Sequence, residues 1–433
     1  MKLDEASLRS LELAFGDSAD AFNCDAVRNV QRLHPRDADA VAAAVRWANA
    51  YHQRLCPTSS GRVGARADAI LLDLAGLNGV LEVHQTDMLA VVQAGVLVRE
   101  LGAAAEAIGL AYPPAFLASP TERIGSALAR GAGARSRLAG PHRDYALGLR
   151  VVMGTGDQAL VGSRAIKNQT GYSLTQTLIG SWGALAVVVD ATLRLVPAAT
   201  AHRTCVAEFP SLGAAIEAAV GLGTSAVAPA CVELLDAHTL AALGGASAAR
   251  GANQSLLLVL LTGPTAGELD MRAESAAGAL RRAGAVLAEV AAEPDAAALW
   301  DDRRQAPDRL TGGPTRPVRL TLALPLDDVA HTLTRAVSLL AERGFEPACF
   351  GGVGGGAAEL VLRSRPASAD LLGTVREVVR LVHLGGGSVS GCTGLGIDYD
   401  AWLELLMPAA NATMMRQVRR AVDPNAVLSP HLA

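Results

Sequence analysis

The apolar positions of the chain alternate between two periods, about 3.6 residues in some stretches and about two residues in others. Residues 1–33 favour an N-terminal helical segment, and Pro35-Arg36-Asp37 precede an alanine-rich amphipathic helix over residues 37–52. Short apolar runs then predict strands, a helix that Gly109 ends, and a hairpin around residues 154–157. In order, these are the strands 70–74, 80–83 and 88–94, the helix 98–108, and hairpin strands starting at Leu149 and ending at Val161.

The stretch from Lys167 to Pro197 has the most informative order of residue types. Three glycines flank a short amphipathic helix over residues 172–179, and a β-branched run follows over residues 187–196. The glycines are Gly171, Gly180 and Gly183. Because glycine has no Cβ, backbone at such positions lies close to a ligand or to a crossing helix. Apart from Lys2, Lys167 is the only lysine, which favours a specific role over chance placement.

After Pro197 the pattern becomes strand, helix, strand, strand, helix, and a similar round follows it. The first round covers residues 204–209, 212–222, 231–235, 255–262 and 266–284, and the second covers 316–324, 327–344, 345–351, 359–362 and 367–384. This order predicts an antiparallel sheet with helices on one face, in roughly two ferredoxin-like units.

Composition narrows the class of protein. The 433 residues are half apolar and carry a formal net charge of −4, so neither a nucleic-acid surface nor a polybasic membrane surface is indicated. No apolar run is long enough to span a bilayer, and Met1–Asp20 lacks the pattern of a signal peptide. These features predict a soluble cytoplasmic protein without direct membrane insertion. The six cysteines stand singly, so no zinc site or iron–sulfur cluster is expected, and most are predicted to be small buried hydrophobes.

The motif Lys167-Asn168-x-x-Gly171-Tyr172-x-Leu174, followed by Gly180-Ser181-x-Gly183-x-Leu185, an apolar strand and Pro197, resembles a known family. The family is that of vanillyl-alcohol oxidase and p-cresol methylhydroxylase, in particular the flavoprotein subunits of bacterial glycolate oxidase and D-lactate dehydrogenase. The resemblance runs from about Pro35 to the C-terminus. It implies an α+β fold, with an FAD-binding domain over 34–198, a ferredoxin-like cap over 199–385, and a segment over 386–433 that returns to the FAD-binding domain.

The resemblance also implies three cofactor segments. The family's glycine-rich pyrophosphate loop corresponds to Ser59-Ser60-Gly61 and its neighbours, for which a plain polar turn is the alternative. The second segment includes Pro114, Ser119, Ile124, Gly125 and Ser126; the family usually has a second glycine at Ser126, whose Cβ crowds a close approach. In the third segment Lys167, Gly171, Tyr172 and Gly183 are implied, together with the backbone of Val187 and Val188 beside the adenine.

Charged residues around these segments leave two readings open. Arg123, Arg130 and Arg135 either meet phosphate oxygens or belong to a solvated basic loop. The family has an acidic residue where this chain has Trp182, so a role for that carboxylate is not carried over.

The cap lacks the residues that the family's glycolate and D-lactate members use to hold a divalent metal. Their motif Gly-His-x-Gly-Asp-Gly-Asn-x-His corresponds to Gly351–Glu359, with Gly352, Gly355 and Ala357 at ligand positions. Their Glu-His-Gly corresponds to Cys392-Thr393-Gly394. Glu359 alone cannot hold a metal, and His383 is predicted to be structural. We therefore expect no metal and no inherited general base, and we assign no catalytic residue.

The resemblance leads to an FAD-binding subunit with non-covalent FAD and neither a metal nor an iron–sulfur cluster of its own. Its expected role is that of an accessory flavin subunit in a 2-hydroxy-acid dehydrogenase complex, with a second flavoprotein or an iron–sulfur subunit as partner. Two alternatives remain: a free-standing FAD oxidoreductase with a different substrate, and a scaffold subunit without flavin.

Overall fold

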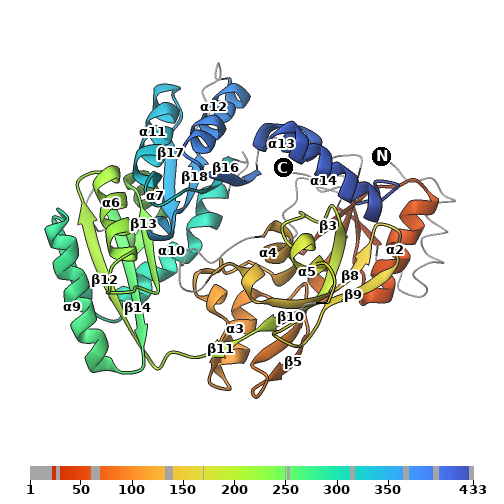
Figure 1. The fold of residues 1–433 in the computed structure, drawn as a ribbon, viewed down its shortest axis with the longest axis horizontal. Coiled ribbons are helices and arrows are strands. Elements are labelled where there is room, and N and C mark those ends of the chain that lie inside the picture. The colour runs from red at the N-terminus through yellow and green to blue at the C-terminus, as the bar shows by residue number, and fades with distance from the viewer. Residues whose placement is uncertain are drawn as a thin grey trace. The chain divides into compact units, whose positions relative to one another are not determined.

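The structure is a computed structural model that describes residues 22–25, 30–59, 69–131, 140–168, 170–248, 250, 254–312, 317–363, 370–393 and 399–428. The chain folds as two compact units (Figure 1). The first comprises the described parts of Met1–Gly133, Pro141–Ala198 and Gly396–Ala433, and the second those of Ala134–Gly140 and Ala199–Leu395. Within the described residues, no helix is long and apolar enough to cross a bilayer.

The first unit begins with a small sheet and a helix. Strands pair in the order β1-β2-β4-β3, with β1 antiparallel and the other two pairs parallel. The strands are β1 (Phe22–Asp25), β2 (Val30–Leu33), β3 (Leu55–Thr58) and β4 (Ile70–Asp73). The predicted helix over 37–52 is confirmed as α2 (Ala38–Ala50), and the Asp37 carboxylate caps it by accepting from Ala40 N at 2.8 Å.

The expected helical segment over residues 1–33 is wrong where the structure describes it, because Phe22–Asp25 and Val30–Leu33 are strands. Leu33 pairs in parallel with Leu72 of β4 and is fully buried. Burial against a strand about forty residues away outweighs the local propensity, which is a weak guide to structure by itself.

The larger sheet of the first unit is five-stranded and antiparallel, in the order β5-β6-β10-β8-β9. Its strands are β5 (Val80–His84), β6 (Leu89–Gln93), β8 (Ala146–Met153), β9 (Gln158–Gly162) and β10 (Ala186–Arg194). These confirm the predicted strands and hairpin. Arg164, two residues after β9, forms an ion pair with Glu82 of β5, at the other edge of the sheet.

Strand β10 is buried on both faces. Val187 and Val189 join a core with α2 and β4, whereas Val188 joins a core with α3 (Val98–Glu106) and α4 (Ile124–Arg130). A strand enclosed in this way reads as a continuous apolar run, as residues 186–189 do. The short helix predicted over 172–179 is confirmed as α5 (Leu174–Leu178).

The C-terminal segment is anchored to the first unit. After α13 (Tyr399–Leu406) and α14 (Ala409–Val422), Val427 O accepts from Leu55 N at 2.8 Å, and Leu428 forms a parallel bridge with Leu55. The Asp423 carboxylate holds this turn by accepting from the amides of Val427 and Leu428, both at 2.9 Å.

The second unit is an eight-stranded antiparallel sheet, in the order β15-β12-β14-β13-β17-β18-β16-β19. Each half is a ferredoxin-like βαββαβ unit, and the two halves join where β13 pairs with β17. The first half is β12 (Ala201–Phe209), α6 (Leu212–Gly223), β13 (Cys231–Leu235), β14 (Ser255–Gly263), α9 (Ala266–Arg282) and β15 (Leu287–Ala291). The second half is β16 (Val318–Ala323), α11 (Val329–Glu342), β17 (Pro347–Gly351), β18 (Ala357–Leu362), α12 (Leu371–Leu384) and β19 (Ser388–Thr393). The α+β fold class with a ferredoxin-like cap is confirmed.

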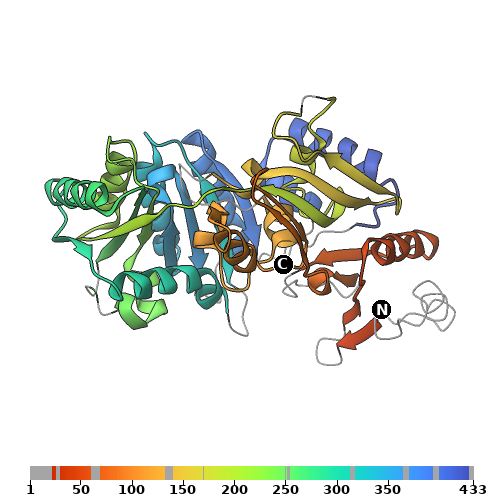
Figure 2. The ribbon, with the colours of Figure 1, turned by 90° about the horizontal axis from the view of Figure 1, so that it is seen from below.

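The expectation of helices on one face is wrong for the first half of this sheet. There α7 (Ala237–Leu243) and α10 (Asp295–Thr311) lie on the face opposite α6 and α9, as Figure 2 shows for α10 and α9. Trp300 of α10 donates from Nε1 to Thr204 Oγ1 at 2.9 Å, while the next residue of β12, Cys205, contacts Ala273 of α9. Sequence periodicity does not reveal α10, because its buried face includes Arg303.

Candidate functional site

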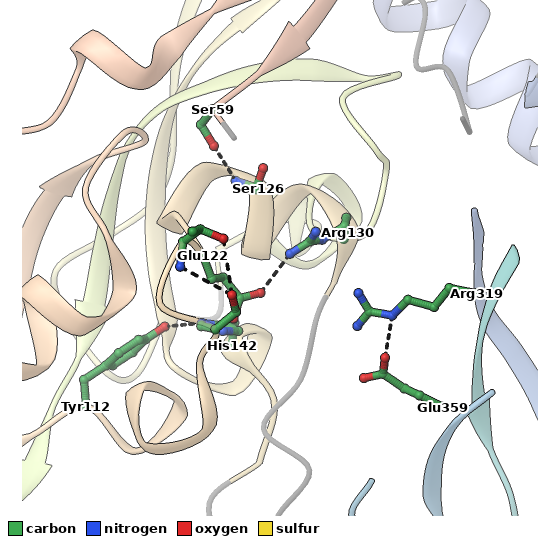
Figure 3. Close-up of polar contacts among 10 residues, drawn as sticks. Ser59, Tyr112, Glu122, Ser126, Arg130, His142, Arg319 and Glu359 are labelled. Atoms are coloured by element: carbon green, nitrogen blue, oxygen red, sulfur yellow. Dashed lines mark hydrogen bonds and ion pairs between the residues drawn. The ribbon is translucent and has the colours of Figure 1, made fainter. Parts of the chain in front are cut away.

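The structure brings together two of the segments assigned to the cofactor. Ser59 follows β3 and is buried, with 2% of its surface exposed, and its Oγ accepts from the backbone amide of Ser126 at 2.9 Å (Figure 3). Ser126 lies in the first turn of α4. Ser60 and Gly61 lie outside the described residues. Ser59, directly after β3, and the start of α4 are thus adjacent in the first unit, as the resemblance implies.

Gly125 has a packing reason to be glycine. Its amide donates to Ala94 O at 2.7 Å, and a Cβ at this position would lie 2.8 Å from the Ala94 Cβ. The preceding amide, of Ile124, donates to Val96 O at 2.9 Å. These two bonds fix α4 on the end of β6, so the close approach at Gly125 is to the protein backbone.

Pro114 and Ser119 belong to the connection that leads into α4. Pro114 is buried in the short helix Pro113–Leu117, and Ser119 O accepts from Glu122 N at 2.9 Å. Glu122 in turn forms an ion pair with Arg130 at 2.8 Å, shown in Figure 3.

The three arginines near this segment differ in what the structure shows. Arg123 donates to Gly95 O and Arg130 pairs with Glu122, so both have partners within the protein. Arg135 lies outside the described residues. Two of the three guanidinium groups are therefore part of the framework that positions α4.

A buried tyrosine–histidine pair stabilises the same region. Tyr112 Oη and His142 Nδ1 are 2.7 Å apart, and Tyr145 packs edge-on against Tyr112 (Figure 3 shows the pair). Burial lowers the pKa of His142 to about 4 and raises the pKa of Tyr112 well above its usual value. The sequence places Tyr112 and His142 at the two ends of the second cofactor segment but does not predict that they pair, because they are 30 positions apart.

The described residues of the segment around Lys167 lie at the surface. Lys167 is exposed, and 93% of the surface of Tyr172 is exposed. Among the described residues, no atom lies within 4 Å of a Cβ built at Gly171, whose φ is +72°. The described protein therefore makes no close approach there, and glycine is favoured because its backbone is left-handed.

The other two glycines of the stretch do mark close approaches within the protein. The amide of Gly180 donates to Leu128 O at 3.0 Å, and that of Trp182 donates to Ala129 O at 2.7 Å. The chain thus crosses the end of α4, which is the helix-crossing alternative of the sequence analysis. Gly183, with φ of +74°, lies beside Pro57 of β3.

Val187 and Val188 place backbone rather than side chains at the candidate site, because both side chains are in the core. They pair with Val152 and Val151 of β8. On the opposite edge, β6 pairs with β10 only from Asp190 onward. Among the described strands, none pairs with Val187 and Val188 on the side that faces β6. The backbone on that side is therefore suited to contact with a ligand.

In the second unit, the segment matched to the metal motif is a glycine turn between β17 and β18. It ends at Glu359, which is 1% exposed and forms an ion pair with Arg319 of the neighbouring strand β16 (Figure 3). In the described part of the chain, no group of three or more His, Cys, Asp or Glu residues is placed to hold a metal. His383 is exposed near the end of α12.

Four cysteines behave as small buried hydrophobes. Cys56, Cys205, Cys231 and Cys349 are buried, and none of these four forms a disulfide. Burial raises the pKa of the Cys205 thiol to about 12 and those of Cys231 and Cys349 well above their usual range. These thiols are consequently protonated and unreactive near neutral pH.

Comparison with known proteins agrees with this geometry. Residues 31–162 match the family of FAD binding domains, and residues 198–432 match the family of FAD linked oxidases, C-terminal domain. The chain is 27% identical over 389 residues to the glycolate oxidase subunit GlcD of Bacillus subtilis, covering 87% of this chain and 80% of that protein. It is 28% identical over 416 residues to a D-2-hydroxyglutarate dehydrogenase of Xanthomonas citri, covering 92% and 87%.

Solved structures show the same fold. A 4-ethylphenol oxidase from Gulosibacter chungangensis aligns with a TM-score of 0.77 at 17% identity, covering 98% of this chain and 97% of that one. A p-cresol methylhydroxylase aligns with a TM-score of 0.76 at 14% identity, covering 99% and 98%. With an FAD-binding domain followed by the family's C-terminal domain over more than half its length, the chain belongs to the FAD-linked oxidases.

Proposed function

We propose that this chain binds FAD non-covalently in its first unit and serves as an accessory flavin subunit of a 2-hydroxy-acid oxidoreductase complex of the glycolate or D-lactate type. FAD, when bound, supplies a two-electron acceptor. The residues that would hold it are backbone groups at Ser59, at Gly125 and Ser126, and at Val187 and Val188. Neither Ser59 nor the Gly125-Ser126 pair offers a histidine or cysteine for a covalent flavin bond.

The arrangement of these residues suits FAD binding, but the hydrogen bonding of α4 does not. Ser59 at the end of β3, the start of α4, and the edge of β10 at Val187 and Val188 that does not pair with β6 belong to one unit. However, the first amides of α4 already have acceptors within the protein. We therefore expect weaker FAD binding than in relatives with two adjacent glycines at this position.

The observation that carries the accessory role is the Arg319–Glu359 ion pair. Glu359 is the only residue of Gly351–Glu359 with a side chain suited to a metal, and it is already bound to a guanidinium. A divalent cation placed there would be repelled by the fixed positive charge of Arg319. This supports loss of metal-assisted chemistry on a 2-hydroxy acid.

The expected effect on catalysis is large. Loss of a general base costs about a hundredfold to ten-thousandfold, and loss of the metal removes several further kcal/mol of charge stabilisation. The inherited reaction should be undetectable above background. A fold kept under these conditions favours a role alongside a second flavoprotein or an iron–sulfur subunit, because the chain has no Cys-x-x-Cys pair with which to build a cluster itself.

The test is to purify the full chain, record its flavin absorbance, and measure dye reduction with glycolate and with D-lactate. We expect FAD to bind, no turnover of either acid, and copurification of a flavoprotein or iron–sulfur subunit from the native host. Robust dye reduction by the chain alone would instead support a free-standing oxidoreductase. Absence of flavin absorbance, together with no thermal shift on adding FAD, would support a scaffold.

A further inference from the structure

The first turn of α4 has no open amide donor. Ile124 and Gly125 donate to the backbone oxygens Val96 O and Ala94 O, and Ala127 donates to Arg123 O within the turn. The amide of Ser126 donates to Ser59 Oγ. Of the four acceptors, only the Ser59 hydroxyl is a side chain, so only it can be exchanged without moving the backbone of β6 or α4.

Ser59 is well placed to hold this amide in the absence of a ligand. Its side chain is 2% exposed and lies directly after β3, whose parallel pairing with β4 fixes its position. A hydroxyl oxygen that accepts from a backbone amide does what a phosphate or flavin carbonyl oxygen does in an FAD site. A glycine at this position would have no such oxygen.

We propose that Ser59 competes with FAD: its hydroxyl occupies the Ser126 amide, and that hydrogen bond must break before the cofactor can accept from the same group. This inference rests on the proposed FAD binding. Ser59 then lowers the affinity for FAD through its hydrogen bond with the Ser126 amide, which exists only in the cofactor-free protein.

The proposal predicts opposite changes in two measurements on the same variant. Ser59→Ala removes the acceptor, so the cofactor-free protein should unfold at a lower temperature. The same variant should bind FAD about two- to tenfold more tightly, which corresponds to the net value of one hydrogen bond. A merely structural serine would weaken both stability and binding.

The experiment uses the full chain stripped of flavin, with the dissociation constant for FAD measured by fluorescence titration and the unfolding temperature measured without FAD. Ser59→Thr keeps the hydroxyl and should retain the wild-type affinity. Ser211→Ala is the matched control, because Ser211 Oγ also accepts a backbone amide, that of Ala214 at the start of α6, but in the second unit. It should lower stability and leave FAD affinity unchanged.

Unchanged or weaker FAD binding by Ser59→Ala would overturn the inference and leave the proposed function standing. Should Ser59→Ala fail to fold, Ser59→Gly provides the same loss of acceptor, and the same outcomes apply. Absence of FAD binding by the wild type and every variant would instead overturn the proposed function, and the inference with it.

Discussion

Acidification should destabilise the first unit through His142. Its side chain is buried, and its Nδ1 lies 2.7 Å from Tyr112 Oη. Within the described residues, no carboxylate forms a hydrogen bond with the imidazole ring. Burial is the main cause that lowers its pKa from 6.5 to about 4. Glu122 acts weakly in the opposite direction, and Arg130 adds to the lowering. The folded protein therefore contains neutral His142 at pH 5, whereas the unfolded chain is protonated there.

The sign of the effect follows from proton binding. Between pH 6.5 and about 4 the unfolded state binds a proton that the folded state does not, so the contribution of His142 is complete above pH 6.5 and is lost as the pH falls. The full pKa difference corresponds to about 3 kcal/mol, of which about 2 kcal/mol is lost between pH 7 and pH 5.

The assay is urea unfolding of wild type and His142→Gln at pH 7 and pH 5. Glutamine can still accept from the Tyr112 hydroxyl but does not titrate. Buried Asp190 and Asp423, whose pKa values are raised chiefly by burial, change equally in both proteins and cancel in the difference. His84→Gln, at an exposed position, is the matched control.

We expect wild type to lose about 2 kcal/mol more than His142→Gln between the two pH values, and His84→Gln to follow wild type. An equal pH dependence in wild type and His142→Gln would refute the reasoning, since it would mean that the buried ring takes up its proton without cost.

Three further predictions concern packing and charge. Gly125→Ala should lower the free energy of unfolding in urea by about 1–3 kcal/mol, because the added Cβ meets Ala94. Adding Ala94→Gly to the same chain should recover part of the loss. A Gly125→Ala variant as stable as wild type would contradict the close contact. Glu233→Gln should lower the free energy of unfolding by about 3–5 kcal/mol, because it leaves the fully buried Arg303 guanidinium without its carboxylate. Glu268→Gln breaks an exposed pair with Arg272 and should lower it by less than about 1 kcal/mol. Equal losses in the two variants would argue against the buried pair. Dialysis against a chelator should change neither the unfolding temperature nor FAD affinity, and stoichiometric metal by elemental analysis would contradict the loss of the metal site.

Periodicity predicted the elements whose burial follows a single repeat. Strand β14 contains an uninterrupted apolar run, and α2 and α12 each present one apolar face, so their positions follow from local pattern. The pattern fails at α10, where Arg303 is buried through its ion pair with Glu233, seventy positions earlier in the chain. A charge that is buried only because of a distant partner is read as exposed in the sequence.

The candidate site was predicted in outline but not in its hydrogen bonds. The resemblance placed Ser59 in one cofactor segment and Gly125 and Ser126 in another, and the structure brings Ser59 and Ser126 together. The bond between them joins residues 67 positions apart, and Ser126 stands where the family usually has a second glycine. No local sequence pattern predicts that the Ser126 amide donates to the hydroxyl of Ser59.

The same reasoning connects the two changed regions of the chain. At Ser59 a hydroxyl accepts from the amide that we propose for a cofactor oxygen, and at Glu359 a carboxylate pairs with the charge of Arg319. In each unit, a polar group within a segment that the resemblance assigns to a ligand has a partner within the protein. Buried polar groups must have partners, so a chain that no longer holds a ligand tightly gains stability from internal ones. Substitutions that remove these internal partners should therefore destabilise the protein without its ligands, even where they restore ligand binding.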